Sequence, residues 1–153
     1  CARASHRVMD MKEFVNTKVW MFCLGVIVIL AALGNIAGAE TVAEDAWGED
    51  NIMGNEAAYE EMWGLHLIPL GVMAIATGVL VKGKALSQMA MTASAGIVVV
   101  IGGGMGFMTQ RHDYGTAGGA ATIIPLIMMA LVITLGVSGY MHKDDEETTE
   151  SVE

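Results

Sequence analysis

Charge is scarce in this chain. Only 16% of its 153 residues are charged and 54% are hydrophobic, whereas about a quarter of the residues in a soluble domain are charged. This apolar excess is too large for a single soluble core and predicts a membrane protein. The net charge of −9 disfavours binding to nucleic acid. The apolar composition also excludes disorder over most of the chain.

Cysteine pairs and familiar catalytic motifs are also missing. Cys1 and Cys23 stand far apart in the sequence, which excludes a C-x-x-C redox motif and a cysteine zinc site. Neither H-E-x-x-H nor G-x-S-x-G occurs, and the glycines at 102–104 lack the Lys-Ser/Thr end of a phosphate-binding loop. The sequence therefore predicts a protein that is not an enzyme.

Four stretches contain no Asp, Glu, Lys or Arg. They cover residues 19–39, 62–81, 85–110 and 114–142. A helix rises about 1.5 Å per residue, so about 20 residues cross a hydrocarbon layer of about 30 Å. Because a helix satisfies its backbone hydrogen bonds internally, we predict an all-α, four-helix transmembrane bundle over residues 19–142. The uncharged spans disfavour ion pumps and proton-coupled exporters, which need a buried charge.

The basic residues predict the orientation of these helices. If the spans alternate in direction, only Arg111 lies on one side of the membrane. The other side then holds Arg3, Arg7, Lys12, Lys18, Lys82, Lys84 and Lys143. Positive residues stay in the cytoplasm, so we expect a multi-pass protein of the cell membrane with both termini cytoplasmic. A basic leader, 1–18, and an acidic, disordered tail, 143–153, are then inside, and the acidic segment 40–61 is outside.

The first span has a second interpretation. The basic residues before it resemble the charged region of a signal peptide, residues 19–33 its apolar core, and the Ala-Gly-Ala at 37–39 a cleavage site. A retained helix is the preferred interpretation, and cleavage after Ala39 would leave three spans in the same orientation. The chain starts without Met, whereas Met9 or Met11 would serve as an initiator. One interpretation of the first residues is therefore spurious upstream sequence.

Small residues recur within the spans. Gly102 and Gly106 form a G-x-x-x-G pair in the third span, and the second span contains Gly71, Ala74 and Gly78. Small residues let helix backbones approach closely and gain dispersion contacts in lipid. We expect these positions to pack helices together, within the chain or between copies.

Two spans share a proline-containing segment. Residues 67–74 and 123–130 are identical at five of eight positions, which either marks a parallel two-plus-two repeat or is a coincidence between apolar segments. Pro69 and Pro125 each lack an N–H and free the carbonyl four residues earlier. We therefore expect a bend or kink in the outer half of both helices.

Two histidines are candidates for a metal or haem site. His66 lies well within the second span, and His112 follows the third, where Met105, Met108 and His112 share one helix face. Thioethers with imidazole suit copper, and two histidines could hold a b-type haem. The site requires the second and third helices to pack side by side, which their short connection at 82–87 favours. The competing interpretation is structural, with methionine as apolar filler and histidine as an interfacial anchor.

Together these patterns predict a small integral membrane protein without catalytic machinery. We expect it to act as an accessory or scaffold subunit, or as a homo-oligomer packed through glycine faces. Its expected partners are the lipid bilayer, copies of itself and other membrane subunits, and no cofactor is expected. One alternative is a copper- or haem-binding protein that uses His66 and His112 near the outer surface. Another is an oligomeric channel or carrier.

Overall fold

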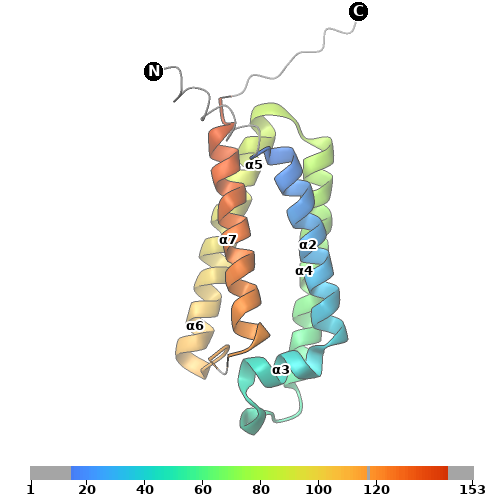
Figure 1. The fold of residues 1–153 in the computed structure, drawn as a ribbon, viewed down its shortest axis with the longest axis vertical. Helices are drawn as coiled ribbons and strands as arrows, with labels where there is room; N and C mark the ends of the chain where they lie inside the picture. The colour runs from blue at the N-terminus through green and yellow to red at the C-terminus, as the bar shows by residue number, and fades with distance from the viewer. Residues whose placement is uncertain (1–14, 117, 145–153) are drawn as a thin grey trace, which may run out of the picture.

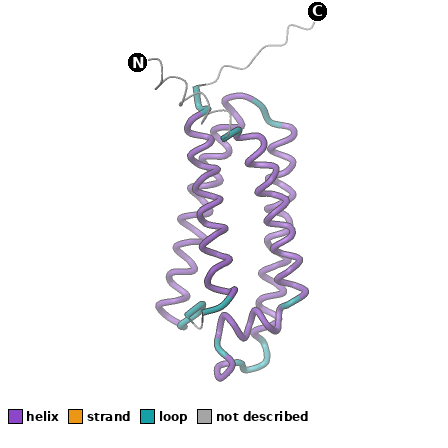
Figure 2. Tube along the Cα trace, viewed as in Figure 1, coloured by secondary structure: helices purple, strands orange, loops and turns teal. Residues whose placement is uncertain are grey.

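The structure, a computed structural model, describes residues 15–116 and 118–144. These residues form helices and connecting loops without any strand (Figure 2). The elements are α2 (Thr17–Ala37), α3 (Ala39–Trp47), the 3₁₀ turn η1 (Glu49–Asn51), α4 (Glu56–Leu80), α5 (Gly83–Gly96), the π-helical η2 (Ile97–Gly102), α6 (Gly103–His112) and α7 (Ala120–Met141). Most of the predicted leader and tail lies outside the described residues.

Four helices are long and apolar enough to cross a membrane. They are α2, α4, the continuous rod Gly83–His112 formed by α5, η2 and α6, and α7. The predicted all-helical architecture with four such helices is thereby confirmed. Two boundaries differ from the uncharged stretches by six residues, and the others by one or two. α4 begins at Glu56, because the Glu56 carboxylate accepts the backbone N–H groups of residues 53–55 at 2.8–3.0 Å.

The start of α7 differs for a conformational reason. The fourth uncharged stretch begins at residue 114, but the helix begins only at Ala120. Gly115, Gly118 and Gly119 have φ angles of 73°, 96° and 71°, a left-handed region that glycine adopts without steric cost and that a right-handed helix excludes. These glycines form the connection to α6 rather than the first turn of a helix.

The four long helices are arranged as two hairpins (Figure 1). α2 packs along α4, and α5 with η2 packs along α7. We call the end that holds Thr17 and Lys143 the terminal end, and the end that holds α3 the loop end. α3 lies across the loop end, where it contacts both α4 and α7. Its buried face consists of Ala39, Ala43 and Ala46.

The expectation that the second and third helices pack side by side is wrong. α4 makes its extensive contacts with α2, and α5 makes its own with α7, while α4 and α5 are joined mainly through their short connection. That connection fixes only where the two helices meet at the terminal end. The small residues along α4 match α2, so the lateral packing of α4 follows its glycine face rather than its neighbour in sequence.

Glycines at intervals of seven residues hold α4 against α2. A Cβ atom added at Gly64, Gly71 or Gly78 would lie 2.9 Å from the carbonyl oxygen of Ala32, 2.8 Å from that of Gly25 and 3.2 Å from that of Lys18, respectively. Each step of seven along α4 therefore matches a step of seven in the opposite direction along α2. Residues seven apart share one helix face, so this spacing allows antiparallel backbone contact over the length of the hairpin.

Serines and glycines close the second hairpin. Ser94 Oγ donates to the carbonyl oxygen of Val132 at 2.6 Å, and Ser87 Oγ donates to that of His142 at 3.0 Å. A Cβ atom at Gly139 would lie 2.7 Å from the carbonyl oxygen of Ser87. In an apolar setting such hydrogen bonds between helices each contribute about 0.6 kcal/mol.

A polar contact and an apolar cluster join the two hairpins near the terminal end. Thr17 Oγ1 lies 2.9 Å from Ser138 Oγ, which donates to the carbonyl oxygen of Val15 at 2.7 Å. Buried side chains of three helices form the core there: Met21, Leu24, Leu86, Ala90, Val132 and Leu135, with Ala74 packed against them. The bundle is therefore tied by side chains at the terminal end and bridged by α3 at the loop end.

The two prolines lie inside α4 and α7, and both helices continue through them. Pro69 and Pro125 each occupy the second helix of a hairpin. The two-plus-two repeat of residues 67–74 and 123–130 stays a prediction.

Candidate functional site

A buried carboxylate organises the loop end. Glu60 on α4 is only 3% exposed. Its Oε1 accepts hydrogen bonds from Trp47 Nε1 at 3.4 Å and from the Tyr114 hydroxyl at 3.1 Å. Its backbone carbonyl accepts a third from Asn35 Nδ2 at 2.6 Å. Glu60 thereby joins α4 to α2, α3 and the α6–α7 connection, which no other described acid does through its own hydrogen bonds.

Aromatic packing completes this cluster of Glu60, Trp47, Tyr114 and Asn35, which we call the Glu60 cluster. The rings of Trp47 and Tyr114 meet edge to face, with centroids 5.1 Å apart and an interplanar angle of 74°. This geometry is favourable for aromatic quadrupoles. The Gly115 N–H donates to the carbonyl oxygen of Ala46 at 2.7 Å, so the loop backbone is also fixed to α3.

The pKa of Tyr114 is shifted by its surroundings in the cluster. Burial raises the pKa of Tyr114 above its ordinary value of 10.0, and the charge of Glu60 and the hydrogen bond to it raise that pKa further. All three effects disfavour a phenolate. Tyr114 is therefore a fixed hydrogen-bond donor to the carboxylate.

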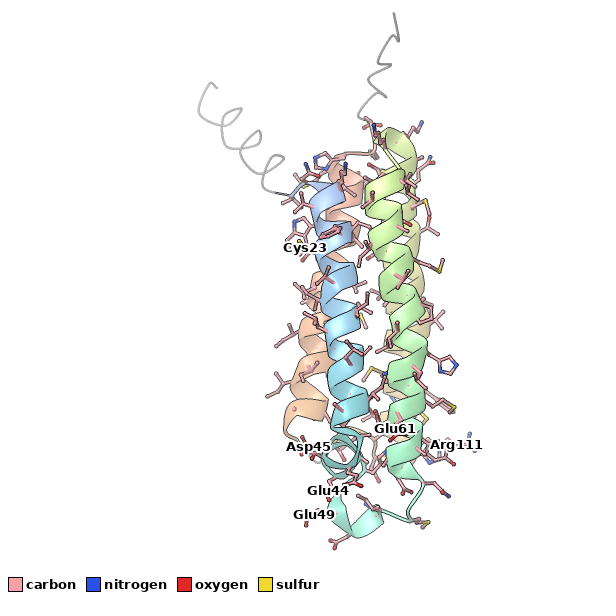
Figure 3. All side chains as sticks on the ribbon, turned by 90° about the vertical axis from the view of Figure 1, so that its right-hand side faces the viewer. Cys23, Glu44, Asp45, Glu49, Glu61 and Arg111 are labelled. Atoms are coloured by element: carbon pink, nitrogen blue, oxygen red, sulfur yellow. The ribbon has the colours of Figure 1, made fainter. Side chains whose placement is uncertain are left out.

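The Glu60 cluster lies beneath an acidic surface. Glu44, Asp45, Glu49 and Glu61 gather around the loop end, with Arg111 at the same level (Figure 3). Asp45 is also close to Gly119, where an added Cβ atom would lie 3.0 Å from Asp45 Oδ2. Its negative charge is thereby placed next to the N-terminus of α7, whose helix dipole favours an anion.

The sequence contained a signal for Glu60 that our sequence analysis did not use. Glu60 precedes Gly64 by four residues, and Gly64 precedes Gly71 by seven. These spacings put the carboxylate on the same face of α4 as the packing glycines. An acid on a helix face that must contact another helix is expected to be buried and hydrogen-bonded.

The two candidate ligand histidines are not brought together. His66 is exposed on α4, with Nδ1 2.6 Å from the carbonyl oxygen of Met62 one turn earlier. His112 is exposed at the end of α6. Toward the loop end, α4 and α6 stand on opposite sides of the bundle (Figure 1). A shared copper ion or haem would need the two imidazoles on facing helices.

The methionines expected beside His112 lie on the same helix. Met105 and Met108 are half-buried on α6, whereas His112 is exposed. Across residues 15–116 and 118–144, no three His, Cys, Asp or Glu side chains form a group able to hold a metal ion. The spacing of i, i+3 and i+7 along α6 places the thioethers and the imidazole on one helix face, and His66 lies on a different helix, α4.

The glycines of the expected packing set have different surroundings. Gly71 and Gly78 face α2 at backbone distance. Gly102 is tight only against the flexible end of Met129, whose Cε would lie 3.0 Å from an added Cβ atom. Gly106 has no atom within 4 Å of its Cβ position. Within the described part of one chain, therefore, no helix backbone packs against Gly102 or Gly106.

Comparisons of this chain with models of known protein families, with curated proteins and with solved structures find no match.

Proposed function

We propose that this chain is a multi-pass protein of the cell membrane without catalytic machinery, which acts as a scaffold that assembles with a second copy of itself. Its four long apolar helices support membrane insertion. The excess of basic residues at the terminal end supports a cytoplasmic location for both termini. The hydrogen-bonded groups of the Glu60 cluster support a structural role for the buried acid.

A retained first helix is part of this proposal. α2 supplies the backbone surface that Gly64, Gly71 and Gly78 contact. Cleavage after Ala39 would remove that surface and leave the α4 glycine face against lipid. The close fit of the two helices therefore favours retention over a signal peptide.

The unoccupied glycine face of α6 carries the proposal of self-assembly. Gly103, Gly104 and Gly106 have no atom within 4 Å of their Cβ positions, whereas Gly25 and Gly71 lie within 3 Å of each other's backbone by the same measure. The rod Gly83–His112 is also the least buried of the four long helices. Small residues in lipid are enriched where helices pack, so this face is suited to a helix from outside the chain.

A second copy is the occupant that this chain's own packing favours. Within the chain, Gly25 meets Gly71 in the first hairpin, and Gly139 meets Ser87 and Ala90 in the second, so small faces of two helices come together in both hairpins. Two α6 faces related by a two-fold axis would present the same small surface to each other, which is the usual geometry of a homodimer.

Capture between two differently tagged copies in one membrane tests this function. Gly106→Leu should strongly reduce capture, because the side chain holds two backbones apart. Val72→Leu on α4, where Val72 is also exposed, lies on the other hairpin and should leave capture unchanged. Equal capture by both variants, or no capture of the wild-type chain by itself, would overturn the proposal.

A further inference from the structure

An open apolar groove runs along the second hairpin. It has a volume of about 530 Å³ and lies between α5 with η2 on one side and α7 on the other. The residues of its lining that matter here are Met91, Ala95, Val98, Gly136 and Tyr140. The volume falls within the range of about 300–1,000 Å³ that is typical of small-molecule sites.

Two local features of the backbone lie along the groove. Val98 and Val99 belong to the π-helical η2, and such insertions in a helix are frequent at functional sites. On the opposite wall, Gly136 offers no side chain, and an added Cβ atom would lie 2.6 Å from Ser94 Oγ. The floor between α5 and α7 is therefore backbone and small side chains, whereas the walls are aliphatic.

The groove is polar and basic only at its mouth near the terminal end. Tyr140 lines that mouth and is 61% exposed, and Lys143 Nζ lies over its ring, 4.0 Å from the centroid. On the other wall, Lys84 is exposed and precedes Met91 by seven residues, which is about two turns on the same face of α5. The Lys143 ammonium group and the Tyr140 phenol thus border the mouth, and Lys84 lies about two turns of α5 before Met91, toward the terminal end.

The surface around the mouth of the groove, at the terminal end, is also mostly basic. Among the described residues of the terminal end, Lys18, Lys82, Lys84 and Lys143 are basic, and Asp144 is acidic. A basic mouth between membrane helices on this side is the pattern that binds anionic lipid headgroups. An apolar groove of this kind suits an acyl chain, because aliphatic side chains make dispersion contacts with methylene groups without requiring a hydrogen bond.

We propose that this groove binds one acyl chain of an anionic phospholipid, whose phosphate is held by Lys84, Lys143 and the Tyr140 hydroxyl. The lipid lies in the leaflet at the terminal end. This inference rests on the membrane insertion proposed above and is independent of assembly through α6, which lies beyond the groove. The headgroup contacts provide selectivity for negative charge, and the groove provides the binding surface for the chain.

The test is native mass spectrometry of the full chain, extracted in detergent and titrated with phosphatidylglycerol or with phosphatidylcholine of the same acyl chains. The wild-type monomer should retain one phosphatidylglycerol in preference to phosphatidylcholine. Inorganic phosphate should not compete, because it lacks the acyl chain. Reading only the monomer peak keeps the result independent of self-assembly, and the need for detergent during extraction reports membrane insertion separately.

Two pairs of variants locate the site. Ala95→Phe fills the groove and should abolish retention, whereas Ala93→Phe, on an exposed part of α5 that does not line the groove, should retain the lipid. Ala95→Leu serves if the phenylalanine variant loses helicity. Lys84→Gln and Lys143→Gln should each weaken phosphatidylglycerol binding about fivefold, and Lys18→Gln, on the other hairpin, should not.

Either of two results overturns the proposal. One is equal retention of the two lipids by the wild-type chain. The other is equal retention of phosphatidylglycerol by the Ala95 and Ala93 variants. A protein adduct in place of the lipid, displaced by neither phospholipid, would assign the groove to a partner helix and would also reject the lipid site.

Discussion

Gly25 and Gly71 face each other where α2 packs on α4. A Cβ atom added to Gly25 would lie 2.7 Å from the carbonyl oxygen of Gly71, and one added to Gly71 would lie 2.8 Å from that of Gly25. Real Cβ atoms do not approach a backbone oxygen so closely. Even alanine at either position must therefore push the two helices apart, which is the basis of the first prediction.

Gly71→Ala should destabilise the chain by about 1–3 kcal/mol through overpacking. Gly106→Ala is the matched control, because its Cβ would meet no atom within 4 Å, and it should be neutral or slightly stabilising for the monomer. The measurement is thermal unfolding of monomeric protein in detergent. Equal melting temperatures for the two variants would contradict the packing of α2 on α4. The sequence alone had suggested Gly106 as a helix-packing position, within the chain or between copies.

Glu60→Gln and Tyr114→Phe should loosen the loop end. Hydrogen bonds to a charged group contribute about 1.5–3 kcal/mol each, so Tyr114→Phe should lower the free energy of unfolding by about that amount. Tyr59→Phe is the control, since Tyr59 is exposed on the same end of α4. Hydrogen exchange should show faster opening of α3 in the two Glu60-cluster variants and no change in the control.

Alkaline pH should destabilise the wild-type chain through Tyr114. Its pKa in the folded state is raised above the ordinary value of 10.0, so above pH 10 the unfolded state loses this proton while the folded state keeps it. The stabilisation from this group is thus complete below pH 10 and is lost as the pH rises beyond it. The stability difference between wild type and Tyr114→Phe should shrink over that range. A constant difference would show that Tyr114 titrates normally.

Ser138→Ala should weaken the connection between the hairpins. Ser138 is fully buried, contacts Thr17 Oγ1 and donates to the carbonyl oxygen of Val15. Its loss should cost about 1–2 kcal/mol, because the Val15 carbonyl loses this donor and Thr17 Oγ1 keeps only its contact with His142 Nδ1 at 3.3 Å. Thr134→Val is the control, since Thr134 Oγ1 donates only to Ala130 one turn earlier in the same helix. Chemical denaturation of both variants in detergent measures the difference.

The proposed orientation can be tested with single cysteines in a chain whose Cys1 and Cys23 are replaced by serine. Asn51→Cys, in the exposed turn at the loop end, should react with an impermeant thiol reagent in intact cells. Lys82→Cys, at the terminal end, should react only after permeabilisation. The reverse pattern would place both termini outside. Ser87 is unsuited to this labelling because it is 2% exposed and hydrogen-bonded to His142.

The sequence by itself determined the number of long helices and their class. Charge-free stretches of 20 residues or more have one stable form in an apolar medium, so the four helices follow from composition and length. Even the left-handed glycines before α7 and the seven-residue glycine spacing of α4 are local properties of the chain. The helix ends moved by a few residues, where a cap such as Glu56 or a run of glycines decided them.

Only the tertiary structure decided which helices pair and which polar groups are buried. Several helix faces carry small residues, and their spacing along the sequence does not determine which two faces pack against each other. The match of Gly64, Gly71 and Gly78 with α2 is a relationship between helices, and it separates His66 from His112. The burial of Glu60 likewise depends on Trp47 and Tyr114, which reach it from distant parts of the chain only after the hairpins pack.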